Sequence, residues 1–449
     1  MASHIPTMRW TVFVLIVIVF LGQACNYAPN PLTSTPVITS IEKPSATITP
    51  SATLPTSTPH ATATWTEIPV KTLLEQLQTA LLNELHKTAT PDINGERPFG
   101  GINNVYWKEI PNQEKNWLIY SLDSRNYDPP QNHFIAVYNF DHGSWIQIAR
   151  RNLENSDHIN DESINLVEID PEKVFIEVKS TAGVHGGCYD LFDFDGSELN
   201  HLISSCASSP DAGEMADLDG DGIEEVVLNW SEDYVFCYTC GVRIARYQLW
   251  RWDGVHLLEV RLSNIEEGTS EQSIQFNNEA VMLANAELWK EAQEKIEKAV
   301  EMNDSDNITI YWNSILIDLI AGKREQAVNK SGFPLLSSVF YGDYENVMDI
   351  MRLYRPNELF SNGSPLISGS AAEGSEEVML DWVNTFTDKA LFVKKELAAA
   401  YFLKAWATYL VNPTAPGIMK NLEKAIELEK DEELYSESYL FLRTGEGGE

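Results

Sequence analysis

Hydrophobic and polar positions follow different periods in different parts of the chain, and the change between them predicts a mixed architecture. After a leucine-rich stretch with helical spacing that opens at Pro69, apolar and polar residues alternate from about Pro91 to Asn264. This alternation predicts strands with one face toward a core. From about Phe276 the period lengthens to that of a helix. We therefore expect an α+β, multidomain protein, in which a mostly antiparallel β-domain precedes an all-α domain of helical repeats.

Eleven candidate strands fill the β-rich region, and turn residues separate almost all of them. They span residues 104–108, 116–122, 133–140, 145–150, 164–169, 174–180, 189–194, 199–205, 224–230, 242–252 and 255–262. The helix predicted ahead of them, from Pro69 to the residue before Pro91, carries its leucines on one face. We expect this face to pack against the β-domain.

Three of the predicted hairpins resemble one another, because each runs an alternating aromatic strand into an aspartate and a glycine and returns through an apolar strand. They lie at residues 138–143, 191–196 and 249–254. The glycine supplies the positive φ that a tight hairpin turn requires. Phe140, Phe194 and Trp252 align with steps of 54 and 58 residues, which is a blade-like repeat length. Only about three such units fit, and a closed propeller needs about four or more. We expect an open or sandwich-like β-domain built from propeller-type units.

One acidic loop within this region carries the clearest chemistry in the sequence. It reads Asp-Leu-Asp-Gly-Asp-Gly-Ile-Glu-Glu, with Asp217, Asp219 and Asp221 at alternate positions and Glu225 at the ninth. Oxygen ligands at this spacing suit a hard cation, and the glycine after the third aspartate allows the sharp turn. We expect calcium as the cofactor, bound by these four side chains and by the Ile223 carbonyl. The alternative is a solvated Asp/Gly turn without a metal.

The residues after the loop distinguish it from an EF-hand. Val226, Val227 and Leu228 form an apolar, β-branched run that predicts a strand, whereas an EF-hand loop continues as a helix. In this respect the loop resembles the calcium loops of FG-GAP and VCBS repeats, the family that includes the integrin α-subunit propeller. The resemblance implies an ion that contributes to stability rather than to chemistry.

The N-terminus predicts export. Arg9 provides a positive n-region, an uninterrupted apolar run follows from Val12 to Leu21, and the sequence Gly-Gln-Ala then leads to Cys25. The run is too short to span a bilayer comfortably. The segment resembles a bacterial lipoprotein signal, which implies that Cys25 becomes the lipidated first residue, exposed on the outer side of the cytoplasmic membrane. A soluble secreted protein and an uncleaved N-terminal anchor are the alternatives.

A proline-rich stretch separates this signal from the rest of the chain. Prolines interleave with Thr, Ser and Ala there, and Glu42 and Lys43 carry its charge, so no core can form. We expect a disordered stalk that holds a folded head away from the envelope. The predicted boundaries are 1–25 for the signal, 26–66 for the stalk, 67–264 for the β-rich domain with its first helix and acidic loop, and 265–449 for the helical domain.

Four further cysteines, an even set, predict structural disulfides in an exported protein. Cys188 and Cys206 lie almost equidistant from the turn at 195–196, so a hairpin places them opposite each other. Cys237 and Cys240 then close on themselves or bracket a tight turn. A redox Cys-x-x-Cys site normally opens a helix, and a zinc ribbon uses two close pairs, so both alternatives fit less well.

The helical region begins with a predicted hairpin, 279–287 and 289–302, in which small and large apolar residues alternate on facing sides. These residues are Ala280, Leu283, Ala292, Ile296 and Ala299. They stand at the offsets of a tetratricopeptide repeat, which the hairpin resembles. A second unit follows about 35 residues later, with 311–320 as its first helix and a turn near Gly322. The resemblance implies a concave face for a protein or peptide partner. An unspecialised helical bundle is the alternative.

Composition narrows the function. The chain has 66 acidic and 32 basic residues and a formal net charge of −34, which repels phosphate backbones and anionic membrane surfaces. We expect no nucleic-acid partner, and membrane contact through the N-terminal lipid only. No catalytic constellation is apparent, so we expect a non-enzymatic cell-envelope lipoprotein that acts as a calcium-stabilised binding or scaffolding module. The alternative is an envelope-associated hydrolase of glycans, with Trp145, Trp250 and Trp252 stacking on sugars.

Overall fold

The computed structural model describes most of the chain beyond the predicted stalk. The described residues are 70–88, 102–111, 116–123, 133–153, 156, 158–170, 173–266, 270–302 and 307–444. The predicted signal and stalk, with Cys25, lie outside them. Glu67–Glu449 form one compact unit. None of the helices in the described segments is both long and apolar enough to cross a membrane.

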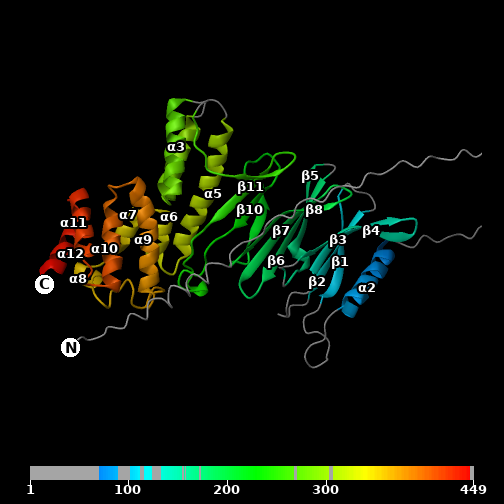
Figure 1. Ribbon diagram of the computed structural model, residues 1–449, viewed down its shortest axis with the longest axis horizontal. Helices are drawn as coiled ribbons and strands as arrows, with labels where there is room; N and C mark the ends of the chain where they lie inside the picture. Colours follow the sequence, from blue (N-terminus) through cyan, green and yellow to red (C-terminus); the bar gives the residue numbers. More distant parts are fainter. Residues whose placement is uncertain are drawn as a thin grey trace, which may run out of the picture. The chain divides into compact units, whose positions relative to one another are not determined.

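The β-rich region folds into three four-stranded antiparallel sheets, and the strands of each sheet lie in chain order (Figure 1). The first sheet contains β1 (Ile102–Glu109), β2 (Asn116–Asp123), β3 (His133–Asp141) and β4 (Ser144–Leu153). The second contains β5 (Ile164–Asp170), β6 (Lys173–Ala182), β7 (Gly186–Phe194) and β8 (Leu199–Ala207). The third contains β9 (Gly213–Ala216), β10 (Glu225–Asn229), β11 (Tyr247–Trp252) and β12 (Leu257–Val260). Together with the helices, they confirm a mixed α+β protein.

The three Asp/Gly hairpins occupy equivalent places in the three sheets. Each joins the third strand of its sheet to the fourth, as β3 to β4, β7 to β8 and β11 to β12. Gly143, Gly196 and Gly254 have φ values of 80°, 90° and 96°. The predicted positive φ of these turns is therefore confirmed. A side chain at these positions would strain the backbone.

Successive layers share apolar contacts, so the sheets are covered on both faces. The helix α2 (Val70–Thr88) packs on the first sheet, the first sheet on the second, the second on the third, and the third on the helical region. Leu74 and Phe134 are buried between α2 and the first sheet, and Ile135 and Phe192 between the first and second sheets. Phe175 and Val226 are buried between the second and third sheets, and Leu249 and Ile317 between the third sheet and the helices. This two-sided burial explains why β7 is buried along nearly its whole length.

The helical region contains α3 to α12 within the described residues. Their bounds are Glu271–Asn285 (α3), Trp289–Glu301 (α4), Ile308–Lys330 (α5), Pro334–Tyr341 (α6), Tyr344–Met351 (α7), Pro356–Leu359 (α8), Glu376–Val393 (α9), Ala398–Val411 (α10), Gly417–Leu428 (α11) and Glu433–Thr444 (α12). The predicted hairpin is present as α3 and α4. All five of its alternating apolar residues are buried, as the sequence predicts.

The turn predicted near Gly322 is wrong, because α5 continues through this residue without a break. A glycine inside a helix costs only about 1 kcal/mol relative to alanine. Burial of Ile317, Ile320 and Ala321 on the same helix outweighs that cost. The helix begins at the amide oxygen of Asn307, which accepts hydrogen bonds from the next free backbone N–H groups.

Asparagine side chains join the third sheet to the helices. The Asn313 amide accepts a hydrogen bond from the Ser263 N–H (3.0 Å) and donates one to the Ser263 carbonyl (2.7 Å). The Asn278 amide makes the same pair of bonds with Ile265, at 2.8 and 2.9 Å. Because these amides bond the connecting backbone from both sides, the segment between β12 and α3 is held against α3 and α5.

Candidate metal centre

The acidic loop connects β9 to β10 in the third sheet. Its ends are fixed by antiparallel pairing, in which Glu225 lies opposite Ala216. Strands therefore flank the loop on both sides, which confirms the predicted strand after it and excludes the helix–loop–helix arrangement of an EF-hand. The sequence missed β9, because Gly-Glu-Met-Ala contains no β-branched or aromatic residue.

Three of the predicted ligands converge on one point. Asp217, Asp219 and Glu225 each offer one carboxylate oxygen, and these oxygens lie within 4.8 Å of one another. Asp221 is not a member of this group, and its Oδ1 accepts a hydrogen bond from the Ile223 N–H (2.7 Å). The spacing in the sequence thus brings together the first, third and ninth positions.

Backbone N–H groups hold the loop aspartates in place. The two carboxylate oxygens of Asp217 accept hydrogen bonds from Gly220 (2.7 Å) and Gly222 (3.2 Å). Asp219 accepts one from the Asp221 N–H (3.1 Å). Both glycines have positive φ, 77° and 90°, which L-residues rarely adopt. The glycines are therefore needed for the loop to wrap around its first carboxylate.

Glu225 is the buried member of the group. Its residue is 3% exposed, and its Oε2 accepts a hydrogen bond from the Leu218 N–H (2.9 Å). Burial, together with the nearby carboxylates of Asp219, Asp221 and Asp217, raises the pKa of Glu225 to about 7. Burial also raises the pKa of Asp219. The crowded carboxylates repel one another, and a cation between them would relieve this repulsion.

Two contacts that no sequence pattern indicates link the loop to the helical region. The Tyr311 hydroxyl on α5 donates a hydrogen bond to the Asp219 carbonyl oxygen (3.0 Å), across a separation of 92 residues. Leu218 packs against the core that the third sheet shares with the helices. The conformation of the loop is thereby coupled to the position of α5.

The disulfides follow the pairing that the sequence favoured. Cys188 and Cys206 face each other across β7 and β8, with Cα atoms 4.1 Å apart. Cys237 and Cys240 close a short turn. Because all four sulfur atoms are paired, no zinc site is formed by them. The Cys237–Cys240 turn is a three-residue 3₁₀ helix rather than the start of an α-helix, so it lacks the helix N-terminus that activates a redox thiol.

The sequence matches no protein-family model and no curated protein. The assignment of a function therefore depends on the side chains of the acidic loop and on the packing around it.

Proposed function

We propose that this protein is a non-enzymatic cell-envelope lipoprotein that acts as a calcium-stabilised binding or scaffolding module. The observation that carries the proposal is the convergence of Asp217, Asp219 and Glu225 in one loop. In this proposal the ion contributes stability, because it binds the folded loop and not the unfolded chain.

The chemistry of the group favours calcium. Its donors are all carboxylate oxygens, which hard cations prefer. The three oxygens all lie within 4.8 Å of one another, which is within the roughly 5 Å that can separate two oxygens bound to the same calcium ion. The Asp221 side chain and the Ile223 carbonyl remain the proposed additional ligands.

The surroundings of the loop support a structural role for the ion. The loop closes the β9–β10 hairpin and contacts α5 through Tyr311. A bound ion would therefore fix the junction between the third sheet and the helices. The three hairpins in equivalent places support the further proposal that each sheet is a propeller-type unit of the FG-GAP or VCBS kind.

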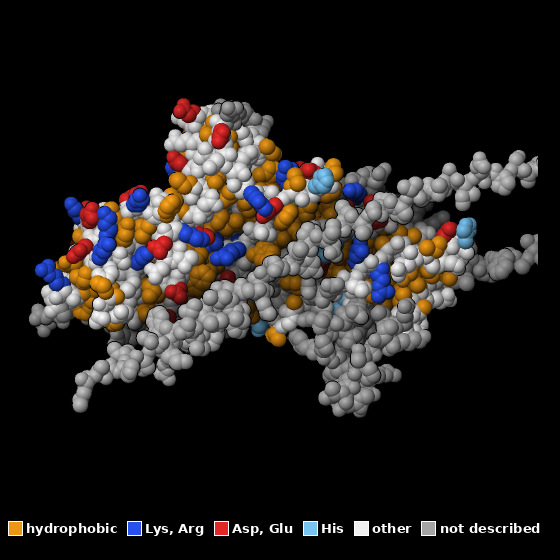
Figure 2. Space-filling view, in the orientation of Figure 1, with side chains coloured by type: hydrophobic (Ala, Val, Ile, Leu, Met, Phe, Trp, Pro, Cys, Tyr) orange, Lys and Arg blue, Asp and Glu red, His pale blue; other side chains and the backbone are white. Residues whose placement is uncertain are grey.

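The helical region offers a surface for a protein or peptide partner, which we propose in line with its tetratricopeptide-like first hairpin. A cavity of about 810 Å³ lies between α3 and α9. Met282 and Phe392 at its edge are 47% and 83% exposed. Figure 2 shows apolar side chains interspersed with charged ones over these helices. Exposed apolar groups in such a setting favour contact with another protein.

Export and the lipid anchor at Cys25 belong to the same proposal. Two disulfides in the described chain support an oxidising environment outside the cytoplasm.

The alternative, a glycan hydrolase, is less well supported, because the tryptophans considered for sugar stacking pack against layers of the fold. Trp250 and Trp252 contact the core between the second and third sheets, and the Trp145 N–H donates to the Leu73 carbonyl of α2.

Replacing Asp219 with alanine tests the ligand role. We expect Asp219→Ala to lower the unfolding temperature measured in calcium and to leave the temperature in excess chelator almost unchanged, because only the bound state loses a ligand. Asp431→Ala, at an exposed position on the helical side, serves as the matched control and should behave like the parent in both buffers. Equal losses in calcium and in chelator would show that Asp219 acts only within the fold.

A further inference from the structure

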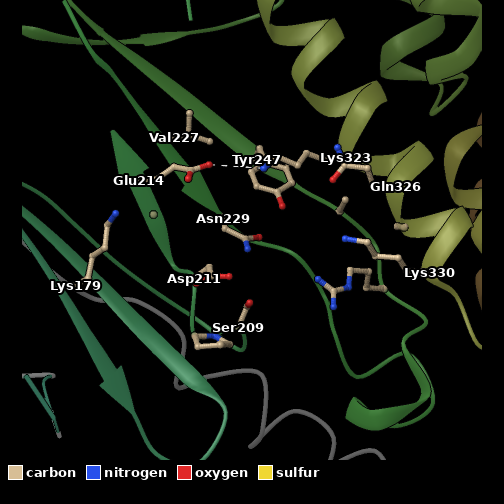
Figure 3. A pocket seen from close by; sticks show the side chains of 15 residues that line it. Lys179, Ser209, Asp211, Glu214, Val227, Asn229, Tyr247, Lys323, Gln326 and Lys330 are labelled. Atoms are coloured by element: carbon tan, nitrogen blue, oxygen red, sulfur yellow. Dashed lines mark ion pairs between the residues drawn. The ribbon is translucent and has the colours of Figure 1, made fainter. Parts of the chain in front are cut away.

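A second site is suggested by a polar cavity that none of the predicted metal ligands lines. It has a volume of about 350 Å³ and lies between the third sheet and α5 (Figure 3). Lys323, Gln326 and Lys330 line it from α5 at spacings of three and four residues, which place them on one helix face. Val227 on β10 and Ala245, in the segment before β11, also line it with short side chains.

Four cationic side chains surround this cavity, from three separate parts of the chain. Lys179 lies on β6, Arg243 precedes β11, and Lys323 and Lys330 lie on α5. Figure 3 shows Lys179 on one side and the two α5 lysines on the other, with Asn229 between them. In a chain with twice as many acidic as basic residues, this concentration of positive charge favours an anionic ligand.

The cations retain donor capacity for a ligand. Their nearest carboxylates lie at 3.2 Å for Lys179, 3.4 Å for Arg243 and 3.7 Å for Lys323. Charge-assisted hydrogen bonds are shorter, at about 2.7–2.9 Å. No hydrogen bond from any of the four cations to another residue is found within the described segments. Lys394, in contrast, donates to both carboxylate oxygens of Glu291, at 2.9 and 2.8 Å.

Two largely buried residues also contribute neutral donors to the cavity. Asn229 is 7% exposed, and its Oδ1 accepts a hydrogen bond from the Ser231 N–H (3.0 Å), which fixes the orientation of the amide. The amide NH₂ of Asn229 has no acceptor among the described residues. Ser209, also 7% exposed, likewise has no partner for its hydroxyl there. Both groups line the cavity and can donate hydrogen bonds to acceptor atoms of a ligand there.

Two carboxylates define the ligand further. Asp211 and Glu214 line the same cavity and are exposed to solvent. They would repel a multiply charged phosphate but can accept hydrogen bonds from hydroxyl groups. We propose that the cavity binds a small hydroxylated carboxylate of the sugar-acid class. Its carboxylate group is held by Lys330 and Arg243, and its hydroxyl groups bond to Asn229 and Glu214. The site does not depend on the calcium proposal.

Calorimetric titration of the full chain with glucuronate tests this assignment. We expect saturable binding that weakens as salt is added, because exposed charges are screened. The double variant Arg243→Gln, Lys330→Gln should bind at least about tenfold more weakly, since each of these cations contributes a charge-assisted hydrogen bond to the ligand carboxylate. Lys420→Gln, an exposed lysine on α11, should leave the affinity unchanged. The single variant Lys330→Gln repeats the test with a smaller change, and thermal unfolding of each variant verifies that it folds.

Neutral and phosphate probes distinguish the alternatives. Glucose should bind much more weakly than glucuronate, and so should inorganic phosphate. The assignment is overturned by the absence of saturable binding, by equal binding of glucose and glucuronate, by tighter binding of phosphate, or by unchanged binding in the folded double variant.

Discussion

Replacing Glu287 with glutamine is expected to lower the free energy of unfolding by about 3–5 kcal/mol, because the change removes the counter-charge of a buried cation. Arg324 on α5 is 2% exposed. Its guanidinium donates one hydrogen bond to the Phe340 carbonyl (2.7 Å) and one to the Glu287 carboxylate (3.1 Å). Burial lowers the pKa of Arg324 to about 10, so the guanidinium stays charged at neutral pH.

Glu287 joins three elements through its carboxylate. Besides Arg324, it accepts hydrogen bonds from the Trp289 indole N–H (2.9 Å) and from Lys389 on α9 (2.9 Å). Its backbone has φ of 63°, an uncommon conformation for a residue other than glycine. The three hydrogen bonds offset this backbone strain. Loss of the carboxylate should therefore loosen the contacts among α4, α5 and α9.

Chemical denaturation of Glu287→Gln and of Glu291→Gln gives the comparison. Glu291 pairs with Lys394 at a partly exposed site, where an ion pair contributes about 0–1 kcal/mol. The control should therefore lose at most about 1 kcal/mol. Equal losses in the two variants would show that Glu287 has no special role in holding the helices together.

The same carboxylate makes the stability depend on acid pH. Burial by itself raises the pKa of Glu287, but Arg324, Trp289 and Lys389 together hold it below its ordinary value. A carboxyl group with a lowered folded-state pKa stabilises the protein fully above the unfolded-state pKa, and this contribution disappears as the pH falls through the folded-state pKa. Glu287→Gln should lack this part of the acid sensitivity.

Removing the cross-strand disulfide is expected to lower the free energy of unfolding by about 3 kcal/mol. The double substitution Cys188→Ala, Cys206→Ala opens a loop with a sequence separation of 18 residues. The matched variant Cys237→Ala, Cys240→Ala opens one with a separation of 3. The second variant should lose less, because closing a shorter loop restricts the unfolded chain less.

Urea denaturation of both disulfide variants, beside the unreduced parent, measures this difference. A larger loss for the Cys237–Cys240 variant would contradict the expected order. It would also show that this turn, whose Cys240 carbonyl accepts a hydrogen bond from Gly332 (3.1 Å), stabilises the end of α5 more than loop length indicates.

The sequence pattern located most elements because local signals and packing agree there. All eleven predicted strands are present, and the symmetry of Cys188 and Cys206 about their turn predicted the pairing register. The exceptions have local causes. β9 lacks strand-forming residues, and the first half of α3 is too polar to show a helical period. The continuation of α5 through Gly322 depends on burial, which the sequence does not show.

The sequence predicted only the part of the candidate site that lies within a single loop. The spacing of Asp217, Asp219 and Glu225 within nine residues identified the acidic group, and the fourth predicted carboxylate, that of Asp221, is not part of it. The Tyr311 hydrogen bond joins residues 92 positions apart and depends on how α5 packs. The polar cavity likewise combines side chains from β6, the segment before β11, and α5, which no local pattern relates.

Thermal unfolding in calcium and then in excess chelator tests the central proposal most directly. If the loop binds calcium, the ion stabilises the folded protein by about 2.7 kcal/mol at a free concentration one hundred times the dissociation constant. We therefore expect a higher unfolding temperature in calcium and a return to the lower value in chelator. The same unfolding temperature in both buffers would contradict the proposal and would identify the loop as an acidic surface turn.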